Sequence, residues 1–196
     1  MTIDYLEIGN IKASLKKDEF NQAIISTGKY INKTDIIEQI ISLQPPDSKT
    51  LVYCTRESDL NEFFIKRIMG PHSKMMASKL GLYQVLMPKR RTIFFVNNVE
   101  LIEEPEDIDC VILVDIQYLS DKMQKHVLYS TLGVKEYKLY LVVSPPANEC
   151  FIKELWFNNE EFSKYLVPSM KLDMNPEWPE ETKRTIYREV YGEFVI

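Results

Sequence analysis

Residues 110–115 read CVILVD, five apolar residues followed directly by an aspartate. An uninterrupted apolar run of this length indicates a strand that is covered on both faces. Such strands belong to parallel sheets with helices on both sides. In these sheets a ligand binds beyond the carboxyl ends of the strands, so Asp115 stands where a ligand is expected.

Other segments of the chain have the same apolar character. They are residues 22–26 (QAIIS), 50–54 (TLVYC), 91–97 (RTIFFVN) and 138–144 (KLYLVVS). Stretches with helical spacing of apolar residues lie between or after them, at 33–43, 58–69, 120–129 and 149–157. This alternation predicts an α/β fold with a mostly parallel central sheet and helices on both faces.

The composition is that of one globular domain covering residues 1–196, with 45% hydrophobic and 27% charged residues. The formal net charge of −5 argues against a domain that grips nucleic acid by bulk charge on its own. The sequence has neither a secretion signal nor an apolar run of about 20 residues, so we expect a cytoplasmic protein without a membrane partner. Its three cysteines and two histidines do not have the spacing of a metal cluster.

Residues 28–34, GKYINKT, follow the first predicted strand and lead into a predicted helix. A phosphate-binding loop has the pattern GxxxxGK[ST] in this context, and its lysine reaches the β and γ phosphates while its hydroxyl binds Mg²⁺. Lys33 and Thr34 stand at the last two positions, but Asn32 replaces the last glycine. Asparagine is the best substitute for glycine at a left-handed turn. The segment also fits an ordinary turn at the start of a helix.

The strand that ends at Asp115 has the form of a Walker B strand, whose aspartate holds Mg²⁺ through water. A glutamate that orients the attacking water normally follows, and here the residue is Ile116. An aspartate that caps a strand end is the alternative interpretation. Ser144 and Pro145 end another strand, at the place where motor triphosphatases couple the nucleotide state to nucleic acid; a plain joint between strand and helix would look the same.

Taken together, the order and spacing of these segments resemble the ATPase domain of the large terminase subunit, the motor that packages DNA into the heads of tailed phages. The resemblance covers roughly residues 21–196. The similar segments are residues 26–34 (Walker A, with Lys29 at its basic position), 50–69, 110–119 (Walker B), 141–156 (coupling motif) and a Gly-Glu-Phe ending at 192–194. Residues 1–20 would form an N-terminal extension, in which Tyr5 or Phe20 would stack on a base, and residues 171–196 a closing helix and tail.

This resemblance implies a P-loop NTPase fold of the ASCE or RecA-like type, with ATP and Mg²⁺ as cofactors. The residues it implies for nucleotide binding are Gly28, Lys29, Asn32, Lys33, Thr34 and Asp115, with Thr34 and Asp115 also serving the magnesium ion. Ser144 and Pro145 would serve coupling. Arg56, Arg90 and Arg91 are candidates for phosphate or DNA contact.

We therefore expect a terminase-like ATPase domain in viral DNA packaging that binds nucleotide with weak or no hydrolysis by itself, since Ile116 cannot orient water. Its implied partners are double-stranded DNA in an assembled motor, other terminase subunits, a nuclease domain, the portal, and copies of itself in a ring, all in the host cytoplasm. The alternative is a non-enzymatic interaction module that assembles with or regulates an active motor or another DNA-processing complex. A helicase-like or generic P-loop domain is a third interpretation, which the Gly-Glu-Phe ending disfavours.

Overall fold

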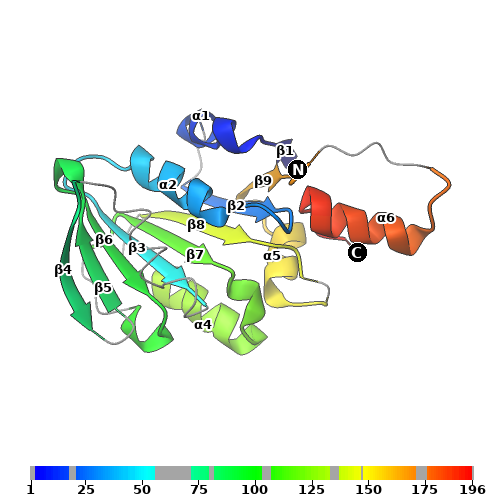
Figure 1. The fold of residues 1–196 in the computed structure, drawn as a ribbon. Coiled ribbons are helices and arrows are strands. Elements are labelled where there is room, and N and C mark those ends of the chain that lie inside the picture. Colours follow the sequence, from blue (N-terminus) through cyan, green and yellow to red (C-terminus); the bar gives the residue numbers. More distant parts are fainter. Residues whose placement is uncertain are drawn as a thin grey trace.

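A computed structural model describes residues 3–17, 21–55, 72–79, 82–102, 107–132, 137–146, 148–170 and 176–195. The strands of these residues form one nine-stranded sheet in the order β1-β9-β2-β8-β7-β3-β6-β5-β4 (Figure 1). Their bounds are β1 Ile3–Tyr5, β2 Gln22–Thr27, β3 Lys49–Cys54, β4 Lys74–Lys79, β5 Leu82–Leu86, β6 Thr92–Val96, β7 Cys110–Val114, β8 Lys138–Val143 and β9 Ser163–Val167. In this spatial order, the seven strands from β1 through β9, β2, β8, β7 and β3 to β6 pair in parallel. The last two strands differ, because β5 is antiparallel to both β6 and β4.

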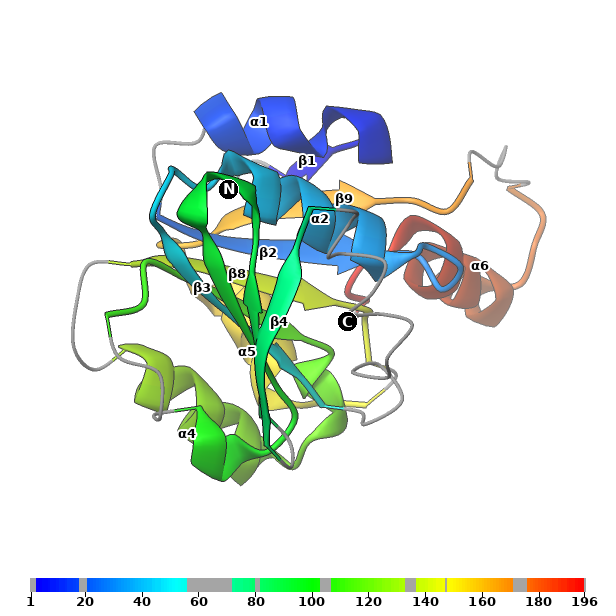
Figure 2. The same cartoon turned by 60° about the vertical axis from the view of Figure 1, so that its left-hand side comes forward.

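Helices cover both faces of this sheet, as the sequence predicts (Figures 1 and 2). Their bounds are α1 Ile11–Lys17, α2 Lys33–Leu43, α4 Asp121–Leu132, α5 Phe151–Asn158 and α6 Glu180–Ile186. Short 3₁₀ turns lie at Ile8–Asn10, Pro88–Arg90, Val99–Leu101 and Ile116–Tyr118, and a π turn at Tyr187–Tyr191 continues α6. None of the described helices is both long and apolar enough to cross a membrane.

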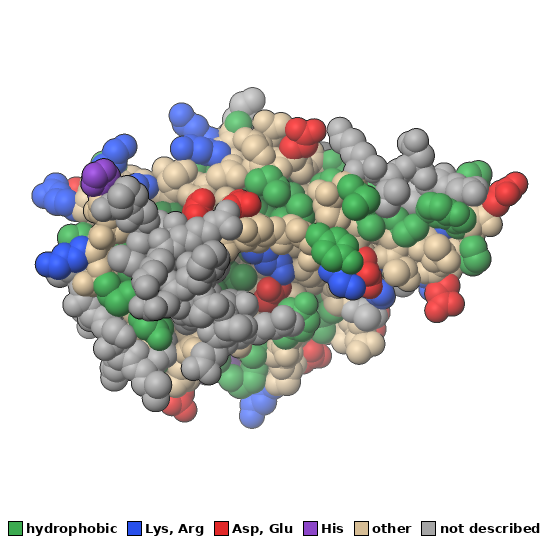
Figure 3. Space-filling model, viewed as in Figure 1, with side chains coloured by type: hydrophobic (Ala, Val, Ile, Leu, Met, Phe, Trp, Pro, Cys, Tyr) green, Lys and Arg blue, Asp and Glu red, His purple; other side chains and the backbone are tan. Residues whose placement is uncertain are grey.

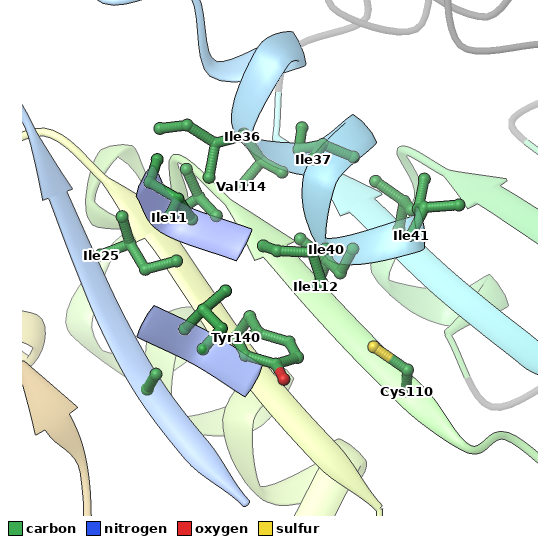
Figure 4. Packing of buried hydrophobic residues seen from close by; sticks show 14 of the residues in the cluster. Ile11, Ile25, Ile36, Ile37, Ile40, Ile41, Cys110, Ile112, Val114 and Tyr140 are labelled. Atoms are coloured by element: carbon green, nitrogen blue, oxygen red, sulfur yellow. The ribbon is translucent and has the colours of Figure 1, made fainter. Parts of the chain in front are cut away.

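Two apolar cores lie on the two faces, and successive strand residues alternate between them because side chains of a strand point to opposite sides. Ile25 of β2 belongs to the core under α1 and α2, while Ile24 belongs to the core under α4 and α5. Figure 4 shows the first core, where the isoleucines of α2 lie over Ile112 and Val114 of β7. Burial on both faces explains why the central strands have uninterrupted apolar sequences.

The five predicted strands are present, each within one residue of its expected bounds, and so are the helices expected at 33–43, 120–129 and 149–157. The helix expected at 58–69 lies outside the described residues. Five further elements, β1, β4, β5, β9 and α1, were not predicted from the sequence. These elements lie toward the edges of the sheet or are short, and lysines interrupt the apolar pattern of β4 and β9.

The neighbouring positions of β2, β8 and β7 determine where a site can form. These strands are parallel, so their carboxyl ends lie at one edge of the sheet, with Ser26 beside Val143 and Val114 beside Val142. The segments that follow the three strands therefore meet at that edge.

Candidate functional site

A pocket of about 530 Å³ opens at this carboxyl edge. Its lining comes from the turn before α2, from the ends of β7 and β8, and from the π turn after α6. The lining residues are Lys29, Ile31, Asn32, Lys33, Thr34, Val114, Asp115, Tyr118, Ser144, Pro145, Arg188 and Glu189. In Figure 3 basic and acidic side chains lie next to one another near the middle of this face of the molecule.

Lys33 is at the centre of the polar contacts. Its Nζ forms an ion pair with Asp115 Oδ1 and donates a hydrogen bond of 2.8 Å to Ser144 Oγ. Ser144 Oγ also lies 3.3 Å from Thr27 Oγ1. The side chains of Lys33 and Asp115 are 16% and 12% exposed, so the pair lies largely out of water. Residues from three separate segments thus form one polar cluster.

The backbone of Asp115 is in the left-handed conformation, with φ 57° and ψ 28°. Aspartate tolerates this conformation better than most residues do. The left-handed backbone at Asp115 ends β7 at the preceding residue, Val114. The backbone N–H of Asp115 donates to Val142 O at 3.0 Å, and its carbonyl accepts from Thr55 Oγ1 at 3.1 Å. The carboxylate is therefore fixed at the end of β7, facing the start of α2.

Ile116 points away from the pocket. Its side chain is fully buried and belongs to the core under α4 and α5. The next residue along, Gln117, does contact the Asp115 carboxylate: its Nε2 donates to Asp115 Oδ1 at 2.7 Å. Gln117 is not among the site residues predicted from the sequence. The left-handed turn at Asp115, which brings positions 115 and 117 together, cannot be read from the sequence.

The turn before α2 differs from a glycine-like turn at Asn32. Its φ is −75°, and its side chain caps the helix by accepting from Thr34 N at 3.0 Å. Residue 32 therefore needs no glycine here, contrary to the expectation that asparagine substitutes for glycine at a left-handed turn. The backbone N–H groups of Asn32 and Lys33 have no acceptor among the described residues.

Glycine is required instead at Gly28, where the chain passes close to the π turn. A Cβ atom at Gly28 would overlap the carbonyl oxygen of Val190 and would lie 2.8 Å from Ser169 N. Gly28 N donates to Val167 O at 2.9 Å. Gly28 is therefore packed under the turn and does not line the pocket itself.

The C-terminal segment closes this side of the site. Lys29 N donates to Glu189 O at 2.6 Å, and Lys29 Nζ pairs with Glu189 Oε2 at 3.2 Å. Ser26 Oγ donates to the carbonyl of Gly192, which has φ 75°. Phe194 stacks on Trp156 with the ring centroids 4.7 Å apart. Both ribbon views place α6 beyond the carboxyl end of β2 (Figures 1 and 2).

Each residue of the Gly-Glu-Phe ending thus has a defined structural place. Glu193 accepts a hydrogen bond of 2.5 Å from Tyr5 OH, which ties this ending to β1. Partial burial and Glu193 together raise the pKa of Tyr5 to about 12. Tyr5 itself does not line the pocket, and Phe20 lies outside the described residues. Arg188 lines the pocket and was missed by the sequence analysis, because its segment returns to the site from a distant part of the chain.

Two of the arginines proposed for phosphate or DNA contact, Arg90 and Arg91, do not join this cluster. Arg90 pairs with Asp47, with Nε and Oδ1 2.7 Å apart, and Arg91 donates to Ile41 O at 2.9 Å. Both precede β6, so they lie at the amino end of a strand whose carboxyl end faces the site. Arg56 lies outside the described residues.

The donors and acceptors of this pocket fit a phosphate group with a magnesium ion. An ammonium group and the start of α2 suit phosphate oxygens, while a hydroxyl and a carboxylate are oxygen ligands of the kind Mg²⁺ prefers. Among the described residues, no cluster of three or more His, Cys, Asp or Glu side chains offers a dedicated cage for a metal.

Comparisons with known proteins give structural matches alone, since no protein-family model and no curated protein matches the chain. The ATPase domain of the Thermus phage P74-26 large terminase has a TM-score of 0.61 at 13% identity, over 94% of this chain and 93% of that one. A large terminase from a thermophilic bacteriophage, in complex with ADP, has a TM-score of 0.60 at 10% identity, over 96% of this chain and 53% of that one. The same terminase in complex with ATP-gamma-S gives 0.59 at 11% identity.

This chain therefore spans about half the length of the terminase with ADP. The HK97 bacteriophage large terminase matches more weakly, with a TM-score of 0.52 at 10% identity over 87% of this chain and 39% of that one. At identities this low, the structural matches establish the fold alone. The chain has the α/β fold of the ATPase domain of bacteriophage large terminases.

Proposed function

We propose that this chain is a terminase-type ATPase domain that binds ATP with Mg²⁺ in the carboxyl-edge pocket and hydrolyses it weakly or not at all by itself. The Lys33–Asp115 ion pair at the start of α2 carries the proposal, because it joins a phosphate-binding cation to a magnesium-binding carboxylate. The thermophilic-phage terminase that shares the fold is described in complex with ADP and with ATP-gamma-S.

Phosphate would be held by the Lys33 ammonium, by the N–H groups of Asn32 and Lys33, and by the N-terminus of α2. Thr34 and Asp115 would serve the magnesium ion. On binding, Lys33 would give up its ion pair with Asp115 and contact the phosphate oxygens. The new contacts would offset part of the free energy lost with the ion pair. Gly28 would support this turn by its close packing against the π turn, and Lys29, which pairs with Glu189, would lie at the rim of the pocket.

Weak hydrolysis follows from the position of Ile116. A buried isoleucine neither accepts a proton nor orients water, and loss of such a group costs on the order of 10²–10⁴ in rate. Ser144, which contacts Lys33, and Pro145 would pass the nucleotide state to the DNA-contacting parts of an assembled motor. The proposed partners are double-stranded DNA, other terminase subunits, a nuclease domain, the portal and further copies of the chain in a ring. Residues 1–196 would act as one domain, and the motor would work in the host cytoplasm.

A non-enzymatic interaction module is the second candidate function. Asn32 favours it, because its side chain already occupies the Thr34 N–H that a phosphate-binding loop would offer. Such a module would regulate an active motor or another DNA-processing complex through the same fold.

Calorimetric titration of the chain with ATP, with and without Mg²⁺, tests the proposal together with a phosphate-release assay. We expect saturable binding, loss of affinity by about tenfold or more in Lys33→Ala, and little phosphate release. Lys138→Ala is the matched control, since Lys138 is exposed at the amino end of β8, away from the pocket. Absence of ATP binding by the wild-type chain would favour the interaction module, and rapid turnover would refute the proposed weak hydrolysis.

A further inference from the structure

Gln117 is a buried polar residue that contacts the carboxylate of the site and leaves one of its own polar atoms unpaired. It is 6% exposed, and its Nε2 donates to Asp115 Oδ1 at 2.7 Å. Its Oε1 is buried and has no hydrogen-bond partner among the described residues. The amide cannot be turned to pair both ends, since Oε1 would then face another acceptor at Asp115.

The donors on Asp115 act on one oxygen. Lys33 Nζ and Gln117 Nε2 both donate to Oδ1, and no described residue donates to Oδ2. When Lys33 moves to the phosphates, as the proposed function requires, Gln117 is the side chain that still holds the carboxylate. The orientation of Asp115 then depends on this one amide.

We propose that Gln117 is the positioning residue of Asp115 and keeps the carboxylate oriented for a magnesium-bearing nucleotide once Lys33 is engaged by phosphate. This inference rests on the proposed function. The unpaired Oε1 supports it, because a buried acceptor without a donor disfavours the folded state and an apolar residue would fill the position at lower cost. Partners that orient a metal-binding side chain commonly contribute about 10–100-fold to metal affinity.

The test is the ratio of ATP affinities measured with Mg²⁺ and with EDTA, for wild type and Gln117→Met, alongside melting temperatures. Methionine keeps the length and volume and removes the donor. We expect the ratio to fall about tenfold while the affinity in EDTA stays unchanged. The variant should melt close to the wild-type temperature, because losing the hydrogen bond to Asp115 and removing the unpaired acceptor have opposite effects on stability. A purely structural role would lower the melting temperature and leave the ratio unchanged.

Gln44→Met is the matched control, since Gln44 is also 6% exposed but donates to Ile40 O at the far end of α2. It should lose stability and keep the ratio. Gln117→Leu repeats the measurement if Gln117→Met fails to fold. An unchanged ratio in a folded Gln117 variant overturns the inference while leaving the proposed function standing. A wild-type chain that binds no ATP overturns both.

Discussion

Lys33 at the start of α2 and Asp115 at the end of β7 form an ion pair across 82 positions of sequence, with their side chains largely shielded from water. Removing one partner from such a pair leaves the other desolvated and uncompensated, whereas removing both is far cheaper. The pair therefore couples the stability of the fold to the chemistry of the pocket.

We expect Asp115→Asn to lower the free energy of unfolding by about 1–3 kcal/mol, because it strands the Lys33 ammonium at a partly buried position. The Lys33→Met, Asp115→Asn double variant should lose less than the sum of the single losses. Urea unfolding of all four proteins measures this coupling. Strict additivity would mean that the pair contributes nothing to stability.

Asn32→Gly should increase ATP affinity several-fold, because it frees the Thr34 N–H for a phosphate oxygen. Replacing an asparagine cap by glycine costs only a few tenths of a kcal/mol, so the fold should tolerate the change. Calorimetric titration measures the affinity. Asn98→Gly is the control, since Asn98 caps a 3₁₀ turn by accepting from Glu100 N at 3.1 Å, and it should leave affinity unchanged. Equal effects of the two variants would contradict the competition between Asn32 and phosphate.

Ile116→Glu, which would restore the glutamate usual after a Walker B aspartate, should unfold the chain more than it activates it. The side chain is fully buried among apolar residues, and burying an unpaired carboxylate there should cost about 3–5 kcal/mol. For a chain of this length each kcal/mol lowers the melting temperature by roughly 2–4 °C, so we expect a drop of about 10 °C or more.

Ile116→Val is the control and should cost about 1 kcal/mol. Phosphate release by a stably folded Ile116→Glu variant would contradict this account, since it would require the glutamate to leave the core and reach the pocket.

The sequence was informative wherever local pattern and chemistry coincide. Apolar runs predicted the central strands, and the convergence of parallel strand ends predicted that Lys33, Asp115 and Ser144 lie near one edge of the sheet. The role of Gln117 could not be predicted, because the direction of its side chain after β7 depends on the left-handed conformation of Asp115. The place of Arg188 in the pocket could not be predicted either. Long-range packing brings its segment back to the site, and such packing leaves no local pattern in the sequence.

Gly192→Ala should disturb both the fold and the pocket, because this residue joins the C-terminal segment to the turn that precedes α2. Its φ of 75° disfavours any residue with a Cβ atom, and that atom would lie 2.7 Å from the carbonyl carbon of Thr27 and 2.9 Å from Gly28 N. We expect a loss of about 1–3 kcal/mol in the free energy of unfolding, together with weaker ATP binding as the turn shifts. Gly9→Ala is the matched control, since a Cβ atom there meets nothing within 4 Å. Wild-type melting temperature and affinity in Gly192→Ala would show that the C-terminal segment rests on the turn without supporting it.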